Sequence, residues 1–327
     1  MNAKNGERRP PPDPTIELIA KSPVTSLTFG SGDTPAIISG HQNGQVIKWD
    51  NIILRPEKVL MAHNESVIWL TQIGEVIISQ GRDGEVKFWS CLETEWRTAG
   101  VIPCAPYTFC NSSICLSNNQ YFLSVPSDAC AEIKVHKLTN LSDAHEFESL
   151  SSPHSFQPKD SKRFGMCMRT SSLVSSCLTP VLFVGYESGV LGLWNLKTTE
   201  LLSEVKAHED SIMGMDSWAH EKYIKCVTGS VENQIKSWWI KEFKFEEDKK
   251  VTFPNAGINA LAIRRDGKIV ATGGWDHMCR VFSLKKLNPL AVLSYHKDSV
   301  QCVCFALDHT LATGSKEGHI ALWNIYK

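Results

Sequence analysis

Histidine, serine and aspartate recur along this chain at a spacing that raises the question of hydrolytic chemistry. His63 precedes Ser79 and Asp83, and both come shortly before Trp89. In a nucleophilic triad, a histidine takes the proton of a serine hydroxyl while an acid orients the imidazole. Related sets recur further along the chain at His208, Thr228, Glu232 and Trp238, and at His296, Thr313, Glu317 and Trp323. A structural device repeats in this way and a single active site does not, so we interpret all three sets as structural.

Other catalytic signatures are missing from the sequence. It contains no GxSxG elbow, no P-loop glycine run and no HExxH pair. We therefore predict that the protein is not an enzyme, and we expect no catalytic residues, no cofactor and no metal site.

The elements that must position the recurring sets repeat with a period in the forties. A Trp ends each of five strand-like runs, and we place His136 and Phe282 at the corresponding position of two further runs. The seven closing positions are 49, 89, 136, 194, 238, 282 and 323, so they are 40, 47, 58, 44, 44 and 41 residues apart. A fixed period of about 40–45 residues is typical of four-stranded blades. The sequence therefore predicts an all-β fold, a single seven-bladed β-propeller over residues 15–327.

The two ends of this propeller are expected to meet in the last blade. Only residues 324–327 follow Trp323, too few for a fourth strand. The alternating segment TIELIA at 15–20 precedes the first strand of blade one. We expect this segment to add as the outer strand of blade seven, because closing the ring removes an open sheet edge.

Two segments are expected to lie outside the blades. Residues 1–14 are polar and proline-rich, and we predict that they are disordered. Residues 139–163 are rich in Ser, Pro and acids, and we predict a flexible surface loop there. Such a loop is either a tolerated insertion or a docking segment for a partner.

Charge and cysteine content exclude several classes of partner and ligand. The 34 Lys and Arg nearly balance the 35 Asp and Glu, and no dense run of one sign occurs, so we expect neither nucleic acid nor a membrane surface as partner. No secretory signal and no apolar run of ~18 residues is present, which favours a cytoplasmic location with the nucleus as a second one. The 11 cysteines form no CxxC pair, so we expect reduced thiols without disulfides or zinc.

Several motifs resemble those of a known family. The sequence contains PPPDP near its start, ISQGRDGEVKFW in blade two, and ATGGWDHMCRVF and NPLAVLSYHKDSVQCVCF in the last two blades. The chain resembles WD40 proteins over its whole length, and within them the guanine-nucleotide-binding beta-subunit-like family and its fungal ASTRA relatives. In WD40 blades, a buried His hydrogen-bonds the Asp and the Ser while the indole N–H joins the same network. That network satisfies every buried polar group and stiffens the blade.

The resemblance also implies a function. It implies a protein-interaction scaffold, an adaptor of the TTT co-chaperone assembly that helps phosphatidylinositol-3-kinase-related kinases to fold and persist. We expect a monomeric propeller inside a larger complex, with that assembly and those kinases as partners.

A G-protein-like beta subunit and a ubiquitin-ligase substrate receptor remain alternatives, and an enzyme with a site in the channel is a third. True beta subunits carry a long N-terminal helix that coils with a gamma subunit, whereas only about fourteen proline-rich residues precede the first strand here. We therefore expect no gamma subunit.

A binding face can be placed by counting within the blades. In WD40 blades, the residue before the turn Asp and alternate residues at the start of the first strand project onto the face around the channel. Trp275 stands out, because two glycines leave it little cover and tryptophan is enriched at interaction hot spots; the alternative is that it packs over that Gly-Gly turn. The full set of candidate binding residues is Gln42, Arg82, Glu187, Val231, Trp275 and Lys316 from the turns, and Ile68, Met213, Asn259 and Gln301 from the first strands.

Overall fold

Strands make up nearly all of the regular structure. The computed structural model describes residues 12–30, 36–50, 52–90, 95–139, 141, 148–149, 152–175 and 179–326. Most of the segment 1–14 that we expected to be disordered lies outside these residues. The single helix of the described part, α1 (Ser161–Phe164), has four residues, and no helix there is long or apolar enough to cross a membrane.

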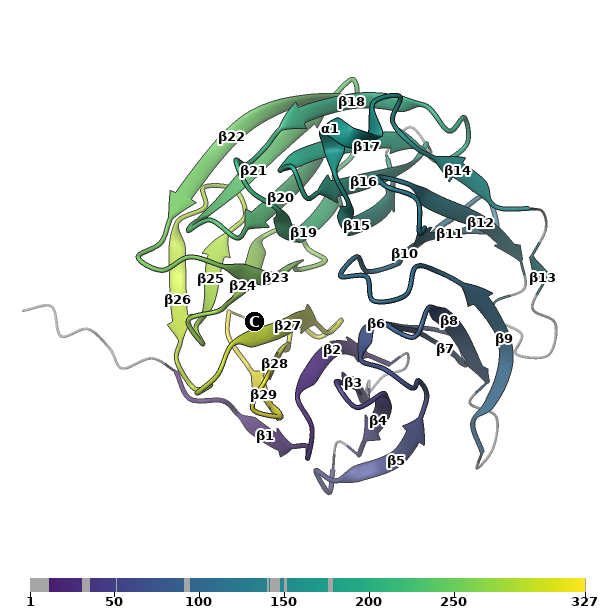
Figure 1. Ribbon diagram of the computed structural model, residues 1–327. Coiled ribbons are helices and arrows are strands. Elements are labelled where there is room, and N and C mark those ends of the chain that lie inside the picture. The colour runs from purple at the N-terminus through teal and green to yellow at the C-terminus, as the bar shows by residue number, and fades with distance from the viewer. Residues whose placement is uncertain are drawn as a thin grey trace, which may run out of the picture.

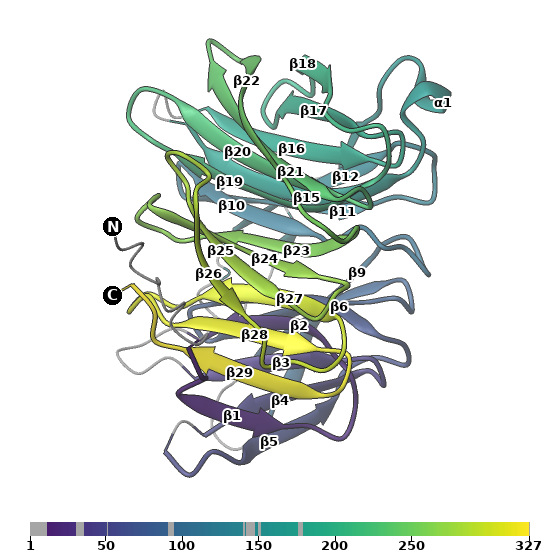
Figure 2. The same ribbon diagram turned by 90° about the vertical axis from the view of Figure 1, so that its left-hand side faces the viewer.

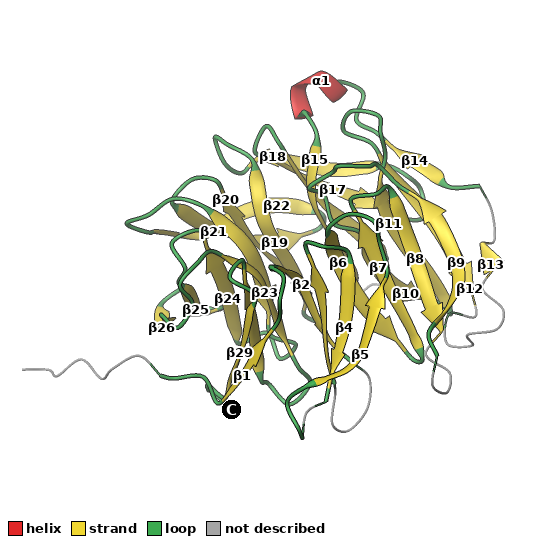
Figure 3. Ribbon diagram, turned by 60° about the horizontal axis from the view of Figure 1, so that its bottom comes forward, coloured by secondary structure: helices red, strands yellow, loops and turns green. Residues whose placement is uncertain are grey.

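Seven antiparallel sheets stand around a central axis, as Figure 1 shows, and together they confirm the predicted seven-bladed propeller. Figure 3 shows the same ring coloured by secondary structure, with α1 at its periphery. The first strand of each blade lies nearest the axis and the last strand lies at the outer edge of the ring.

The strands of the first three blades have the following bounds. Blade one contains β2 (Val24–Phe29), β3 (Ile37–His41), β4 (Gln45–Trp49) and β5 (Pro56–Met61). Blade two contains β6 (Val67–Ile73), β7 (Val76–Gly81), β8 (Glu85–Ser90) and β9 (Arg97–Pro103). Blade three contains β10 (Ser113–Ser117), β11 (Gln120–Pro126), β12 (Ile133–Thr139), β13 (Glu148–Ser149) and β14 (His154–Phe156).

The remaining four blades follow the same order. Blade four contains β15 (Cys167–Val174), β16 (Pro180–Tyr186), β17 (Val190–Asn195) and β18 (Leu201–Lys206). Blade five contains β19 (Ile212–Ala219), β20 (Ile224–Ser230), β21 (Gln234–Lys241) and β22 (Lys244–Thr252). Blade six contains β23 (Ile258–Ile263), β24 (Ile269–Gly274), β25 (Cys279–Ser283) and β26 (Pro289–Leu293), and blade seven contains β27 (Val300–Phe305), β28 (Leu311–Ser315) and β29 (His319–Trp323).

The N-terminal strand closes the ring as predicted. β1 (Ile16–Ile19) pairs antiparallel with β29, and Leu18 stands opposite Ile320. The purple β1 lies beside the yellow β29 in Figures 1 and 2. Leu18 is only 2% exposed and packs into the apolar cluster between blades seven and one. The pairing therefore supplies blade seven with its fourth strand and joins two segments from opposite ends of the sequence.

The core lies between neighbouring blades. The second strand of a blade is buried on both faces, as in β7, whereas the outer strand β22 alternates between half-buried and exposed side chains. Phe88 of blade two, for example, is fully buried against Leu123 and Leu138 of blade three. Burying one such side chain contributes about 1.5–3 kcal/mol, so each interface between blades is a small hydrophobic core.

In blade three the register differs from the one we predicted. In blade two, Ser79 pairs with Lys87 and Trp89 follows two residues later. In blade three, Leu123 occupies the position that Ser79 has in blade two. It packs in the apolar cluster between blades two and three and pairs with His136. The closing position is therefore Leu138, two residues beyond His136. A fully apolar Leu123–Leu138 pair packs here, so no polar signature marked the register.

The expected loop at 139–163 is partly regular structure. β13 and β14 both pair with β12, with His154 opposite Val135 and Phe156 opposite Ile133. Phe156 is 1% exposed and contacts Trp194 edge to face at 5.9 Å. The described part of this segment thus provides the outer edge of blade three, and both of its large apolar residues, Leu141 and Phe156, are buried. Residues 140, 142–147 and 150–151 lie outside the described residues.

Candidate protein-binding mouth

The histidine network of blade two joins four side chains in one chain of hydrogen bonds. His63 Nε2 lies 2.7 Å from Ser79 Oγ, and His63 Nδ1 lies 3.0 Å from Asp83 Oδ1. Trp89 Nε1 donates to Ser79 Oγ at 2.8 Å. Burial lowers the pKa of His63 from its usual value. A neutral imidazole with its proton on Nδ1 then donates to Asp83 and accepts the Ser79 O–H, so each of these contacts has one donor and one acceptor.

Glutamate closes the same network in blades five and seven. His208 lies 3.0 Å from Glu232 and 2.9 Å from Thr228, whose hydroxyl also accepts the Trp238 N–H at 3.0 Å. In blade seven the distances from His296 are 3.1 Å to Glu317 and 2.8 Å to Thr313, and the Trp323 N–H reaches Thr313 at 3.0 Å. The extra methylene of Glu therefore preserves the contact. Burial lowers the pKa of both histidines, which favours their neutral form.

Blades one and four use a residue that sequence reasoning missed. His41 Nε2 lies 2.8 Å from Ser39 Oγ, which accepts the Trp49 N–H at 2.7 Å. In blade four the Trp194 N–H donates to the Tyr186 hydroxyl at 3.2 Å. Both residues lie on the second strand, two positions beyond the Ser position, where blade two has Gly81. A Cβ on Gly81 would come within 2.3 Å of the His63 ring, so this position holds a large side chain only where no preceding His occupies the space.

Blade six replaces the histidine with an arginine. Arg280 forms a bidentate ion pair with Asp276, at 3.0 Å to Oδ1 and 2.6 Å to Oδ2. Its guanidinium also stands 5.1 Å from the centre of the Phe253 ring. The turn Asp of this blade is therefore still held in place, although Thr272 has lost its imidazole partner.

One residue in the turn between the second and third strands occupies an equivalent place around the channel in six blades. These six residues donate their backbone N–H to the loop before the first strand of the same blade, at 2.8–3.2 Å: Gln42, Arg82, Glu187, Val231, Trp275 and Lys316. The tight turn between the second and third strands fixes this geometry, with Gly84 at φ +89° in blade two. The network behind each turn thus holds its side chain at the rim of the channel.

β-Bulges aim a second set of side chains at the channel. In six blades the pairing of the first strand skips one residue near its start: Thr25, Ile68, Met168, Met213, Asn259 and Gln301. A bulge bends the strand and redirects the unpaired residue. Four of the six are the first-strand residues that counting had selected, and all but Met168 line the cavity at the channel entrance.

This cavity, which we call the mouth, has a volume of about 610 Å³. It is lined by Pro23, Thr25, Gln42, Glu65, Ser66, Ile68, Arg82, Phe109, Arg169, Met213, Asn259, Trp275, Ser299, Gln301 and Lys316. Eight of the ten candidate residues are in this set, whereas Glu187 and Val231 are not. Glu187 instead accepts the Met166 N–H at 3.0 Å, within its own blade.

Trp275 lies at the rim of the mouth and is 43% exposed. Its indole N–H donates to Asn259 Oδ1 at 2.6 Å, so the ring has a fixed orientation. One face covers Gly257, where a Cβ would come within 2.1 Å of the ring. The indole therefore packs on the glycine before the first strand of blade six, not on the Gly273–Gly274 pair that we had considered. Its other face remains open to a partner.

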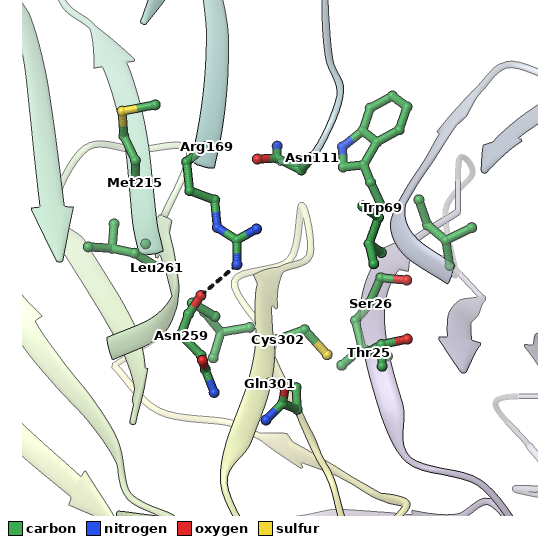
Figure 4. Close-up of a pocket in the computed structure, with 16 residues that line it drawn as sticks. Thr25, Ser26, Trp69, Asn111, Arg169, Met215, Asn259, Leu261, Gln301 and Cys302 are labelled. Carbon is green, nitrogen blue, oxygen red and sulfur yellow. Dashed lines mark hydrogen bonds between the residues drawn. The ribbon is translucent and has the colours of Figure 1, made fainter. Parts of the chain in front are cut away.

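Arg169 narrows the channel below the mouth and was not anticipated from the sequence. Its guanidinium donates to the carbonyl oxygens of Phe109 at 2.8 Å and Asn259 at 3.1 Å, and also to that of Met213. Figure 4 shows the side chain pointing toward Asn259, with their hydrogen bond as a dashed line. It also lines the inner cavity of about 160 Å³ drawn there. One side chain thus ties blades three, four, five and six together at the axis.

The described residues contain no group of three or more His, Cys, Asp and Glu side chains that could hold a metal ion. The nine cysteines in this part of the chain are all free. Burial raises the pKa of the Cys279 thiol to about 12, which keeps it protonated and unreactive at neutral pH. The candidate site therefore consists of the mouth and its rim.

Comparison with known proteins agrees with this geometry. The family model for the WD domain, G-beta repeat, matches residues 248–283 and 287–324. The mouse guanine nucleotide-binding protein subunit beta-like protein 1 is 33% identical over 328 residues, covering 97% of each chain. ASTRA-associated protein 1 of Schizosaccharomyces japonicus is 26% identical, and that of Schizosaccharomyces pombe is 25% identical, each over 93% of this chain and 96% of its own. The chain therefore belongs to the WD-repeat family of guanine nucleotide-binding protein subunit beta-like protein 1.

Proposed function

We propose that this non-catalytic scaffold is an adaptor that brings partner proteins to a co-chaperone assembly, and that its clients are phosphatidylinositol-3-kinase-related kinases. The observation that carries the proposal is the mouth with the half-open indole of Trp275 at its rim. The fungal relatives are named ASTRA-associated protein 1, which supports the choice of assembly. We propose the cytoplasm, with the nucleus as a second location.

The surface around the mouth has the composition of an interaction site. Exposed aromatic side chains gather near the channel, with Trp275 at 43%, Phe109 at 52% and Tyr107 at 68% exposure. Tryptophan, tyrosine and arginine carry a large share of binding energy at protein interfaces. Catalysis would need an activated nucleophile or a charge-stabilising site, and the histidines of blades two, five and seven are instead engaged in buried structural contacts.

Affinity purification tests the proposal, with the full chain tagged and expressed in cells of its own species. We expect subunits of an ASTRA- or TTT-type assembly and the large kinases to co-purify. Recovery of gamma subunits would favour a G-protein-like beta subunit, and recovery of cullin adaptors would favour a ubiquitin-ligase receptor. Either of those results, without the co-chaperone subunits, would overturn the proposal.

A matched pair of variants locates the contact. Trp275→Ala should weaken partner recovery by about 2 kcal/mol, roughly 30-fold in affinity, if the indole is a hot spot. Leu290→Ala is the control, because Leu290 is 39% exposed and lies on the outer strand of the same blade. Both variants should melt close to the unaltered chain. Equal recovery with both would remove Trp275 from the contact and direct attention to residues 139–163.

A further inference from the structure

The charges that line the mouth differ from those of the chain as a whole. The chain carries a net charge of −1, whereas the mouth is lined by Arg82, Arg169 and Lys316 against Glu65 alone. The acids next in sequence to the rim residues are turned away from it. Asp83 contacts His63 and Glu317 contacts His296, both behind the rim. The mouth is therefore a positively charged hollow in a nearly neutral protein.

Arg82 is held ready to receive an acceptor. Its guanidinium stands 4.7 Å from the centre of the Phe109 ring, and its Nη2 donates to the Tyr107 carbonyl oxygen at 2.9 Å. That is the one hydrogen bond its side chain makes within the described residues. Its Nε is buried, so Nη1 and the second N–H of Nη2 are the donors left for an acceptor. A guanidinium already fixed by stacking loses little conformational entropy on binding a carboxylate.

Lys316 and Arg169 supply the other two positive charges of the mouth. The ammonium group of Lys316 is exposed and forms no ion pair with any residue that the structure describes. The Arg169 guanidinium donates to three carbonyl oxygens and, among the described residues, to no carboxylate. Its positive charge is therefore not neutralised by an ion pair. Since the cavity of about 610 Å³ is walled by protein, these charges act through less water than they would on a flat surface.

We propose that the mouth recognises an extended segment of a partner protein through an Asp or Glu side chain, which pairs with Arg82 and Lys316 while Trp275 packs on the neighbouring part of that segment. This inference rests on the proposed scaffold function and names the chemistry of its partner. Charge complementarity selects the acidic side chain, and the bidentate geometry of Arg with carboxylates makes Arg82 the specific contact.

Peptide selection on the purified full chain tests the chemistry without knowledge of the partner. A phage-displayed library of random twelve-residue peptides should yield binders enriched in Asp and Glu. A synthetic selected peptide should bind roughly 10- to 100-fold more weakly when its acidic residue is changed to the amide, as expected for a hydrogen-bonded charge. Its affinity should also fall as salt is raised. Binders that are basic or wholly apolar would overturn the proposal.

Charge variants assign the contact to the mouth. Arg82→Ala and Lys316→Glu should each weaken the selected acidic peptide about tenfold or more, and Arg82→Lys should retain part of the affinity. Glu65→Gln should strengthen binding, because it removes the one carboxylate of the lining. Lys222→Glu is the control for charge reversal, since Lys222 lies in the turn after β19, at the opposite end of the strand from Met213. Equal weakening by Lys222→Glu would show a general charge effect and refute the site.

The two proposals can fail separately. If the unaltered chain recovers its co-chaperone assembly, and Arg82→Ala and Lys316→Glu recover it equally well, the acidic contact is wrong and the scaffold function stands. If acidic peptides bind the mouth and lose affinity with Arg82→Ala, but no co-chaperone subunit is recovered from cells, the acidic contact stands and the proposed assembly is wrong.

Discussion

Replacing His63 with alanine measures what the buried network of blade two contributes to stability. The change removes the 2.7 Å contact to Ser79 and the 3.0 and 3.1 Å contacts to the two oxygens of Asp83. A lost neutral hydrogen bond costs about 1 kcal/mol, and one to a charged group about 1.5–3 kcal/mol. Partial compensation remains, because Ser79 keeps the Trp89 N–H and Asp83 keeps the Asn64 N–H at 3.0 Å. We therefore expect a loss of about 2–3 kcal/mol.

Calorimetry and urea unfolding of the purified chain provide the assay. With about 2–4 °C lost per kcal/mol in a large domain, His63→Ala should lower the Tm by roughly 4–12 °C. His154→Ala is the control, since His154 lies half-buried on β14 outside any such network, and it should change stability by less than about 0.5 kcal/mol. An unchanged melting curve for His63→Ala, or a normal melting curve with lost partner binding, would refute the structural interpretation of this histidine.

Three further perturbations test the ring, blade one and the titration of the buried histidines. Leu18→Asp places a charge at a position that is 2% exposed, so it should release β1 and lower the Tm more than His63→Ala does; an unchanged Tm would contradict closure by this strand. His41→Ala should cost about 1–3 kcal/mol in urea unfolding, since it removes the 2.8 Å contact to the Ser39 hydroxyl and the 3.2 Å contact to the Ser22 carbonyl, and a neutral result would show that these contacts contribute nothing. Burial lowers the pKa of five histidines below the usual 6.5, so the unfolded chain takes up protons first as the pH falls. Stability should therefore decline as the pH falls below about 6.5, where the unfolded chain begins to bind the extra protons. Burial raises the pKa of Asp216 to about 6, so below that pH this one carboxyl offsets part of the loss; a Tm that rises between pH 7 and 6 would contradict this sign.

The ring and its closure could be predicted because their signals are local and repeated. An aromatic residue ends the third strand of most blades, and its spacing counts the blades directly. Closure was predicted from the alternating segment at 15–20, which precedes the first strand of blade one. Leu18 packs with Ile320 and Leu322, which lie near the other end of the sequence.

Blade three could not be placed because its signal is purely apolar. Leu123 and Leu138 occupy the Ser and Trp positions, and leucine there is indistinguishable from any other core residue. We placed His136 at the closing position because the run IKVHK resembles the strands that end in Trp, yet His136 pairs with Leu123, two residues before the closing position. The segment after β12 was equally hard to assign from the sequence. The short strand β14 lies in a polar stretch, and Phe156 is its one large apolar residue.

The substitute networks of blades one and four left a signal that could have been found. Blades with a preceding His have a small residue two positions after the Ser or Thr, such as Gly81, Ser230 and Ser315. Blades one and four have His41 and Tyr186 there. Arg169 left no comparable signal, since its role depends on a bulge and on carbonyl oxygens from three other blades.

In this fold, the side chains that hold each turn in place differ from those that line the mouth. This separation determines which substitutions can change binding. Each rim residue is fixed through its backbone N–H, and in blades two, five, six and seven the acid beside it is held by a His or Arg, so the rim side chain itself contributes little to the fold. Lys316 and Trp275 occupy equivalent places in adjacent blades although one is a cation and the other an indole. The side chains at these turns can therefore vary without unfolding the blade, whereas a change at Asp83 or His63 cannot leave the turn in place. Affinity for a partner should consequently respond to substitutions at the rim at constant Tm, and stability should respond to substitutions in the networks behind it.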